Sequence, residues 1–328
     1  MLPCAPMCGT GRLVSLIATA TRVALTVGAV VSVVVSVGAC AGGSGAGGEP
    51  DAGSFGRVCT PGQPFNLDGS RSGVLAVLSV HVNASGLVET DTTAELLLLL
   101  DSQQTGRDVA LTAKVCDIKI PEVPISGQDQ PIRFQLGAGL LDSVAKVTGT
   151  GKLDGDQTCA TFKSDPITVV IGARLDPPDQ GKLPEANAAG EFNQCLPAGS
   201  PCSAAITNQC VCDQENDGKP GATLLASNVP AISIKEVYVD LRTRFSLTGQ
   251  VFSSDQIEGE IEATLEQGIL SCSKSSGAPC SSSEVGAVKN LNPDIKQNDE
   301  PSTFRAVRVS DSLNCAGLIA MKETLFPR

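Results

Sequence analysis

The chain has little of the aromatic and imidazole chemistry on which many functional sites depend. Its 328 residues include no Trp, one Tyr and one His, and aromatic residues make up 3% of the total. The chain therefore has few aromatic rings on which a sugar or a nucleobase could stack. The lone histidine, His81, cannot build a His-based metal centre, and the spacing shows no nucleophile and orienting acid for it to serve as a general base. We expect His81 to be a structural or surface residue, and the protein not to be an enzyme.

Positive charge is also scarce. The chain carries 24 Lys and Arg against 35 Asp and Glu, a formal net charge of −11. Nucleic-acid phosphates need clustered Lys and Arg, so the composition excludes nucleic acid as a partner. It also argues against adhesion of the folded chain to anionic lipid. Any attachment to a membrane should therefore come from an anchor.

One long apolar run, Val23–Val37, stands near the N-terminus. Arg12 and Arg22 precede it and small residues follow it, which is the pattern of a secretory signal. The four residues Val37-Gly38-Ala39-Cys40 resemble the lipobox of bacterial lipoproteins, with Val37 in place of the commoner Leu. In that family a lipid is attached to the cysteine thiol, and cleavage makes this cysteine the new N-terminus. The resemblance covers residues 1 to about 45.

The resemblance implies an exported protein held at a membrane by lipid on Cys40, with residues 1–39 as the signal peptide. Residues 40–56, rich in Gly and Ser, would form a flexible tether. Ala41, rather than Asp, follows the cysteine, which by the enterobacterial sorting preference favours the outer membrane where the source has two. The alternative is an uncleaved transmembrane helix over Leu13–Ala39, but Arg22 would be costly at mid-bilayer.

The cysteines predict a disulfide framework. Of 13 cysteines, Cys4 and Cys8 lie in the targeting segment and Cys40 is the proposed anchor. An even number then remains, which in an exported chain is typical of disulfides. We expect five bridges, with Cys272–Cys280 as a plausible local pair. The candidates are Cys59, Cys116, Cys159, Cys195, Cys202, Cys210, Cys212, Cys272, Cys280 and Cys315.

Strand patterns dominate the remaining chain. The run Leu96–Leu100 fits either a buried helical turn or a strand buried on both faces, and we interpret it as one arm of a hairpin with residues 109–120. The clearest pattern is strict alternation over residues 237–265, interrupted by a turn at residues 253–256. Apolar residues take the odd positions and charged residues such as Arg242 and Arg244 the even ones. This pattern predicts a long hairpin with one apolar and one solvated face.

The predicted fold class is all-β, with two antiparallel sandwich- or barrel-like domains. We expect the domains over residues 57–180 and 222–328, joined by a Cys-rich connector over 181–221. Residues 271–301 are interpreted as a polar loop.

One motif suggests a metal ion. Asp213, Glu215 and Asp217 stand at alternating positions before Gly218, as in the first half of a calcium loop, and the Lys219 carbonyl would add a ligand. The segment resembles EF-hand, dockerin-like and thrombospondin type 3 calcium loops, although Leu224 stands where their bidentate Glu would be. The alternative is a solvated turn. Zinc on the nearby Cys-Val-Cys sequence is disfavoured, because no histidine is near and the compartment is oxidising.

These observations predict a non-catalytic structural or binding role at the cell envelope. A sheet with an apolar interior would hold an apolar ligand, whereas a filled sandwich would present its surface to an envelope protein for adhesion or assembly. An envelope-associated enzyme of unknown reaction is a further alternative, but no motif supports one.

Overall fold

The computed structural model describes residues 58–84, 88–124, 129–185, 191–204, 208–229, 233–291 and 294–327. Cys40, the predicted signal peptide (1–39) and the predicted tether (40–56) lie outside the described residues. All described residues belong to one compact unit, Pro50–Arg328.

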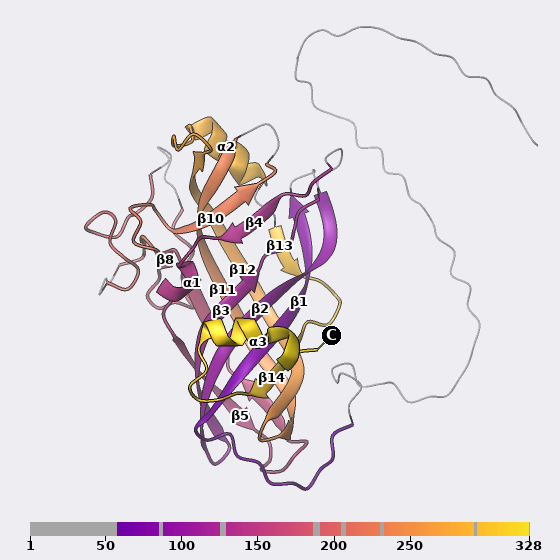
Figure 1. Cartoon of the computed structure of the whole chain (residues 1–328). Coiled ribbons are helices and arrows are strands. Elements are labelled where there is room, and N and C mark those ends of the chain that lie inside the picture. The colour runs from indigo at the N-terminus through magenta and orange to yellow at the C-terminus, as the bar shows by residue number, and fades with distance from the viewer. Residues whose placement is uncertain are drawn as a thin grey trace, which may run out of the picture. The chain divides into compact units, whose positions relative to one another are not determined.

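Antiparallel strands dominate this unit, so the all-β prediction is confirmed (Figure 1). The strands are β1 (Ser70–Ala84), β2 (Val88–Thr105), β3 (Asp108–Lys119), β4 (Arg133–Leu136), β5 (Val147–Leu153), β6 (Thr161–Ser164), β7 (Ile167–Ile171), β8 (Ala173–Arg174), β9 (Cys210–Val211), β10 (Ala222–Ser227), β11 (Ile234–Ser253), β12 (Gln256–Lys274), β13 (Asp294–Gln297) and β14 (Thr303–Arg308). The helices are α1 (Leu140–Ser143), α2 (Ser282–Leu291) and α3 (Cys315–Leu325).

The main sheet closes on itself. Its pairings run β1-β2-β3-β5-β6-β11-β12-β14 and return to β1, and we call this closed path the ring. Four short strands extend it: β7 and β10 follow β6 along the same side of β11, β4 pairs with β10, and β13 pairs with β1. The pair β8–β9 forms a separate small sheet.

The hairpin β11–β12 is the longest element of the ring. Its strands have 20 and 19 residues and turn between Ser253 and Gln256, as the alternation predicts. Odd-numbered residues of β11, such as Val239 and Leu247, are buried inside the ring. On the outer face, Arg242 lies opposite Glu266 and forms an ion pair at 2.6 Å, whereas Arg244 lies opposite Thr264.

The run of five leucines is a strand buried on both faces. Leu96, Leu98 and Leu100 pack inside the ring, and Leu97 and Leu99 point outward. The outward pair is covered by α3, whose Leu318 and the following Phe326 belong to the same cluster. The hairpin interpretation is confirmed, because β2 pairs with β3 across a turn at residues 106–107. A strand that packs against the core on one face and against a helix on the other has no solvent-exposed face. Its sequence therefore need not alternate between apolar and polar residues.

The ring is narrow and filled at the end that holds the β11–β12 turn. There Gly249 pairs with Gly259, and a Cβ on Gly259 would lie 2.3 Å from the Gly249 Cα. Phe304 of β14 packs against this glycine pair, since a Cβ on Gly249 would lie 2.8 Å from its ring. Only residues without side chains allow the strands and the phenyl ring to approach this closely.

The predicted two-domain division does not separate two sheets. Strands β6 and β7, from the predicted domain 57–180, pair with β11, and β14, from the predicted domain 222–328, pairs with β1. Both predicted domains therefore contribute to one ring. The predicted connector packs on its outer face, where Val211 contacts Tyr238 and Leu270.

Two longer helices were not predicted. The segment interpreted as a polar loop, residues 271–301, contains the end of β12, the helix α2 and the strand β13. The helix α3 begins after Asn314, whose side chain accepts a hydrogen bond from the Gly317 N–H. Within the described parts of the chain, no helix combines the length and the apolar character needed to span a membrane.

Candidate functional site

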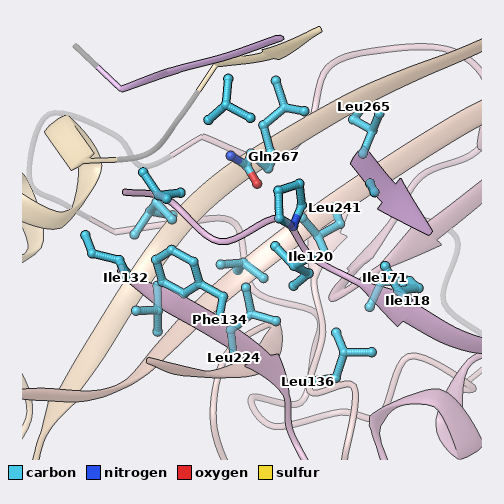
Figure 2. A pocket seen from close by; sticks show the side chains of 18 of the residues that line it. Ile118, Ile120, Ile132, Phe134, Leu136, Ile171, Leu224, Leu241, Leu265 and Gln267 are labelled. Atoms are coloured by element: carbon cyan, nitrogen blue, oxygen red, sulfur yellow. The ribbon is translucent and has the colours of Figure 1, made fainter. Parts of the chain in front are cut away.

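A cavity of about 110 Å³ lies inside the other end of the ring, where residues of α2, β4 and β10 form part of its wall. Its wall is almost entirely aliphatic, and it comes from strands far apart in the sequence. Figure 2 shows side chains of β3, β4, β10, β11 and β12 converging on the space. The labelled side chains include Ile118, Ile120, Ile132, Phe134, Leu136, Ile171, Leu224, Leu241 and Leu265.

The cavity exists because the sheet widens at this end. Here β11 no longer pairs with β6 but with β7 and then β10, and β4 extends the sheet beyond β10. Val288 of α2 and Ile295 of β13 also line the space. Several wall residues, among them Ile118, Phe134 and Leu265, are only half-buried although they point inward. These side chains pack against the buried core and keep accessible surface where they line the cavity.

Few polar residues reach this wall. The charged residues that line it, among those described, are Lys119 and Glu266. The Lys119 ammonium lies 3.5 Å from Glu95, which also pairs with Lys322 of α3 on the outer face. The Glu266 carboxylate pairs with Arg242, also on the outer face. Both charges are therefore directed away from the interior, and the polar groups that remain on the wall are the Gln267 amide and the Thr243 hydroxyl.

The residues predicted to bind calcium lie together in a turn between β9 and β10, and their carboxylates hold the backbone. Asp213 is buried; its Oδ1 accepts the Asp217 N–H at 3.0 Å and its Oδ2 accepts the Gly218 N–H at 2.7 Å. Asp217 accepts the Lys219 N–H, and Glu215 accepts the Thr223 N–H at 2.8 Å. Burial raises the pKa of Glu215.

Within the described ranges, no group of three or more His, Cys, Asp or Glu side chains is arranged to hold a metal. Calcium binding at this turn stays a prediction. The zinc alternative would need free thiolates, whereas Cys202, Cys210 and Cys212 are disulfide-bonded.

Lys219 takes part in a different cluster. Its Nζ lies 2.6 Å from Glu236 Oε2 and 5.1 Å from the centre of the Tyr238 ring. Tyr238 and Ser273 each donate a hydrogen bond to the same carboxylate at 2.9 Å. The hydrogen bond from Lys219 lowers the pKa of Glu236 to about 2. The lysine ammonium thus anchors the predicted calcium turn to the outer face of β11.

All ten predicted cysteines form disulfides, so the predicted framework is confirmed. The local pair Cys272–Cys280 is present, and two bridges lie within the Cys-rich segment. The other two connect distant parts of the chain. The pairs are Cys59–Cys159, Cys116–Cys315, Cys195–Cys210, Cys202–Cys212 and Cys272–Cys280.

His81 lies half-buried on β1. Its Nδ1 is 3.0 Å from Asp91 and its Nε2 is 3.3 Å from Glu89, both on β2. The hydrogen bond with Asp91 raises the pKa of His81.

Asp240 departs from the predicted solvated face. It stands between cavity residues Val239 and Leu241 but points outward, where its side chain is fully buried with 0% exposure. Among the described residues, neither carboxyl oxygen has a hydrogen-bond partner at full hydrogen-bond geometry. The backbone N–H groups of Asp240 and Gly268 still lower the pKa of this carboxyl, by less than burial raises it. Burial raises the pKa of Asp240 to about 7. A Cβ on the opposite residue, Gly268, would lie 2.2 Å from Asp240 Oδ1, so the carboxyl fills the space above this glycine.

Sequence reasoning did not identify the cavity residues as a site. Alternation indicates that Leu241 and Leu265 point inward, but an inward aliphatic residue carries no signal that the space beyond it is empty. A local signal is Gln267, an amide in line with the inward residues Ile261, Ala263 and Leu265. Comparison of the chain with protein-family models, with curated proteins and with solved structures found no match.

Proposed function

We propose that this protein is a lipid-anchored protein of the cell envelope whose folded part binds a small apolar ligand inside the ring. The observation that carries the proposal is the cavity of about 110 Å³ with its aliphatic wall. Protein interiors are normally close-packed, with few voids larger than a water molecule. The side chains that line an unfilled apolar cavity therefore lack dispersion contacts on their inward side. A ligand restores those contacts.

The volume of the cavity limits the size of the ligand that it can hold. An apolar cavity of about 150 Å³ in another protein stays dry and binds benzene. The cavity here is of similar order, so the buried part of its ligand has about six carbon atoms. Binding would draw on the hydrophobic effect, at about 0.8 kcal/mol for each methylene removed from water.

Filling the cavity should abolish this binding. Leu265→Trp places an indole in the cavity, and we expect it to weaken the binding of benzene and 1-hexanol at least ten-fold. Isothermal titration calorimetry of the purified folded chain measures this effect. The matched control is Thr264→Trp, because Thr264 directly precedes Leu265 on β12 and faces solvent. Equal affinity in both variants, or no binding by the parent protein, contradicts the proposal.

The anchor is tested separately. The resemblance of residues 37–40 to a lipobox predicts that Cys40 carries lipid and is the N-terminal residue of the mature protein. Mass spectrometry of the N-terminal peptide should show the lipid mass in the parent protein and not in Cys40→Ser. Several acyl chains hold a protein at a membrane durably, so the variant should also move from the membrane fraction to the soluble fraction. An unmodified Cys40 in the parent protein would refute the anchor.

A further inference from the structure

We infer that the ligand of the cavity is an unbranched alkyl chain, which lies extended along the inward face of β11. The inference rests on the proposed function and specifies the chemical class of the ligand. The cavity is long and narrow, and its wall offers no counter-ion to a charged group.

The cavity extends along β11. This strand contributes lining residues on its inward face from Ile234, its first residue, to Thr243. A strand segment of this length spans about 30 Å. Residues on one face of a strand are about 7 Å apart, so a compact space of about 110 Å³, roughly 6 Å across, would touch only one or two of them. The small volume is therefore drawn out along the strand.

The strands beside β11 line the same length of the cavity. On one side, Leu265 and Ile269 of β12 both belong to the wall. On the other side, the wall passes from Ile171 of β7 to Leu224 of β10, and these two strands pair with successive parts of β11. Figure 2 shows the labelled lining residues spread across the view, from Ile132 on one side to Ile171 on the other. The extended wall is thus built by several strands.

The cavity ends inside the ring. Beyond Thr243, the next inward residues of β11 are Phe245 and Leu247, which are buried in the core and do not belong to the wall. Toward its other end the cavity is lined by Ile234 of β11 and Val288 of α2. A long and narrow space of this kind holds an extended methylene chain, whereas a six-membered ring or a branched carbon needs a wider one.

The wall also excludes charge from the part of the ligand that it surrounds. The charged residues on it, among those described, are paired on the outer face, Lys119 with Glu95 and Glu266 with Arg242. A carboxylate or ammonium group inside the cavity would therefore lose its hydration and gain no counter-ion. Burial of an unpaired charge is far more costly than burial of a neutral group. The part of the ligand inside the ring is therefore hydrocarbon.

Three alcohols of six carbon atoms test the shape of the ligand: 1-hexanol, cyclohexanol and 3,3-dimethyl-1-butanol. Each has one hydroxyl group, so differences in affinity report the shape of the hydrocarbon. By isothermal titration calorimetry of the purified protein, we expect 1-hexanol to bind at least ten-fold more tightly than either of the others. Along the series 1-butanol, 1-pentanol and 1-hexanol, the affinity should rise about four-fold for each methylene.

A wider cavity should lose this preference. Phe134→Ala removes a ring from the wall, so cyclohexanol should bind at least five-fold more tightly than it does to the parent protein. The matched control is Gln135→Ala, because Gln135 is the next residue of β4 and is exposed. It should keep the preference of the parent protein. Where Phe134→Ala does not fold, the three alcohols with the parent protein decide the question alone.

An unbranched chain can belong to a free alkyl compound or to one tail of a lipid. Dihexanoylphosphatidylcholine, titrated below its micelle concentration, distinguishes these sources. Binding within ten-fold of 1-hexanol supports a lipid tail. Its failure to bind, beside tight binding of 1-hexanol, supports a free alkyl compound.

The remaining outcomes separate the inference from the proposed function. If cyclohexanol or 3,3-dimethyl-1-butanol binds the parent protein as tightly as 1-hexanol, the inference is overturned while the proposed function stands. A folded Phe134→Ala variant with the same preference as the parent protein also overturns it, because the width of the cavity would then not select the chain. If neither benzene nor 1-hexanol binds the parent protein, the proposed function itself fails.

Discussion

Asp240→Asn should stabilise the protein at pH 8 by about 2–4 kcal/mol and change its stability little near pH 4. The pKa of Asp240 rises from 3.8 to about 7 because its carboxyl group is buried. The backbone N–H groups of Asp240 and Gly268 act in the opposite direction, as does Lys289 of α2, but their effect is smaller than that of burial. Each unit of difference between the folded and unfolded pKa corresponds to about 1.4 kcal/mol, so the full effect is about 4 kcal/mol.

The direction of this pH dependence follows from whether the folded or the unfolded chain holds the proton of Asp240. Below pH 4 the carboxyl group is protonated in the folded and the unfolded chain, and burial costs little. Between pH 4 and pH 7 the unfolded chain releases its proton while the folded chain keeps it, so the stability of the parent protein falls as the pH rises through this window. Asn has the same shape and no ionisation, and the variant should lack this decline.

Urea unfolding of parent and variant at pH 4, 5, 6, 7 and 8 measures the effect as the difference between the two curves. Asp108→Asn is the control, because the Asp108 side chain is 78% exposed and its replacement should shift both ends of the pH range alike. Curves that run parallel for the parent and Asp240→Asn would show that Asp240 does not titrate in this window.

Removing the disulfide Cys116–Cys315 should cost about 5 kcal/mol of unfolding free energy, the second large effect that we expect. The bridge joins β3 to the start of α3 across a sequence separation of 199 residues. In the loop-entropy description, a longer closed loop restricts the unfolded chain more strongly. The bridge also holds α3 over Leu97 and Leu99, and the ion pair between Lys322 and Glu95 is a second contact of α3 with β2.

The matched control is the local bridge Cys272–Cys280, with a sequence separation of 8 residues, whose loss should cost about 2.5 kcal/mol. Each bridge is removed by paired Cys→Ala substitutions, and both variants are compared with the parent protein by urea unfolding without reductant. An equal loss of stability in the two variants would mean that loop length does not determine the contribution of these bridges.

The parts of the fold that alternation alone determines were predictable. Along β11 and β12, period-two patterning and a short turn predict the length of the hairpin and its inward face. The ambiguity at Leu96–Leu100 has a physical cause, because α3 covers the outer face of β2 from more than 200 residues away. The start of α3 could have been predicted from Asn314, because Asn is a residue type favoured at the N-cap of a helix.

The features that could not be predicted from the sequence depend on which distant segment packs over each face of a strand. Asp240 belongs by its spacing to a solvated face, and it is buried because distant segments pack over β11. The cavity depends on the exchange of β6 for β7 and β10 along one side of β11, which no local pattern records. Gln267 and Thr243 are polar residues at inward positions on the cavity wall. A residue type that conflicts with its position in the pattern points to a functional site.

The closure of the ring has a consequence for the order of folding. The last strand, β14, pairs with both β1 and β12, and the contact with β1 joins Ser72 to Arg308. Contacts between residues this distant form late, because the chain entropy of a long loop must be lost before they contribute. A chain that stops before residue 303 leaves the edges of β1 and β12 without their partner, and unpaired strand edges promote association with other chains. The fold is therefore completed only when the C-terminal residues arrive.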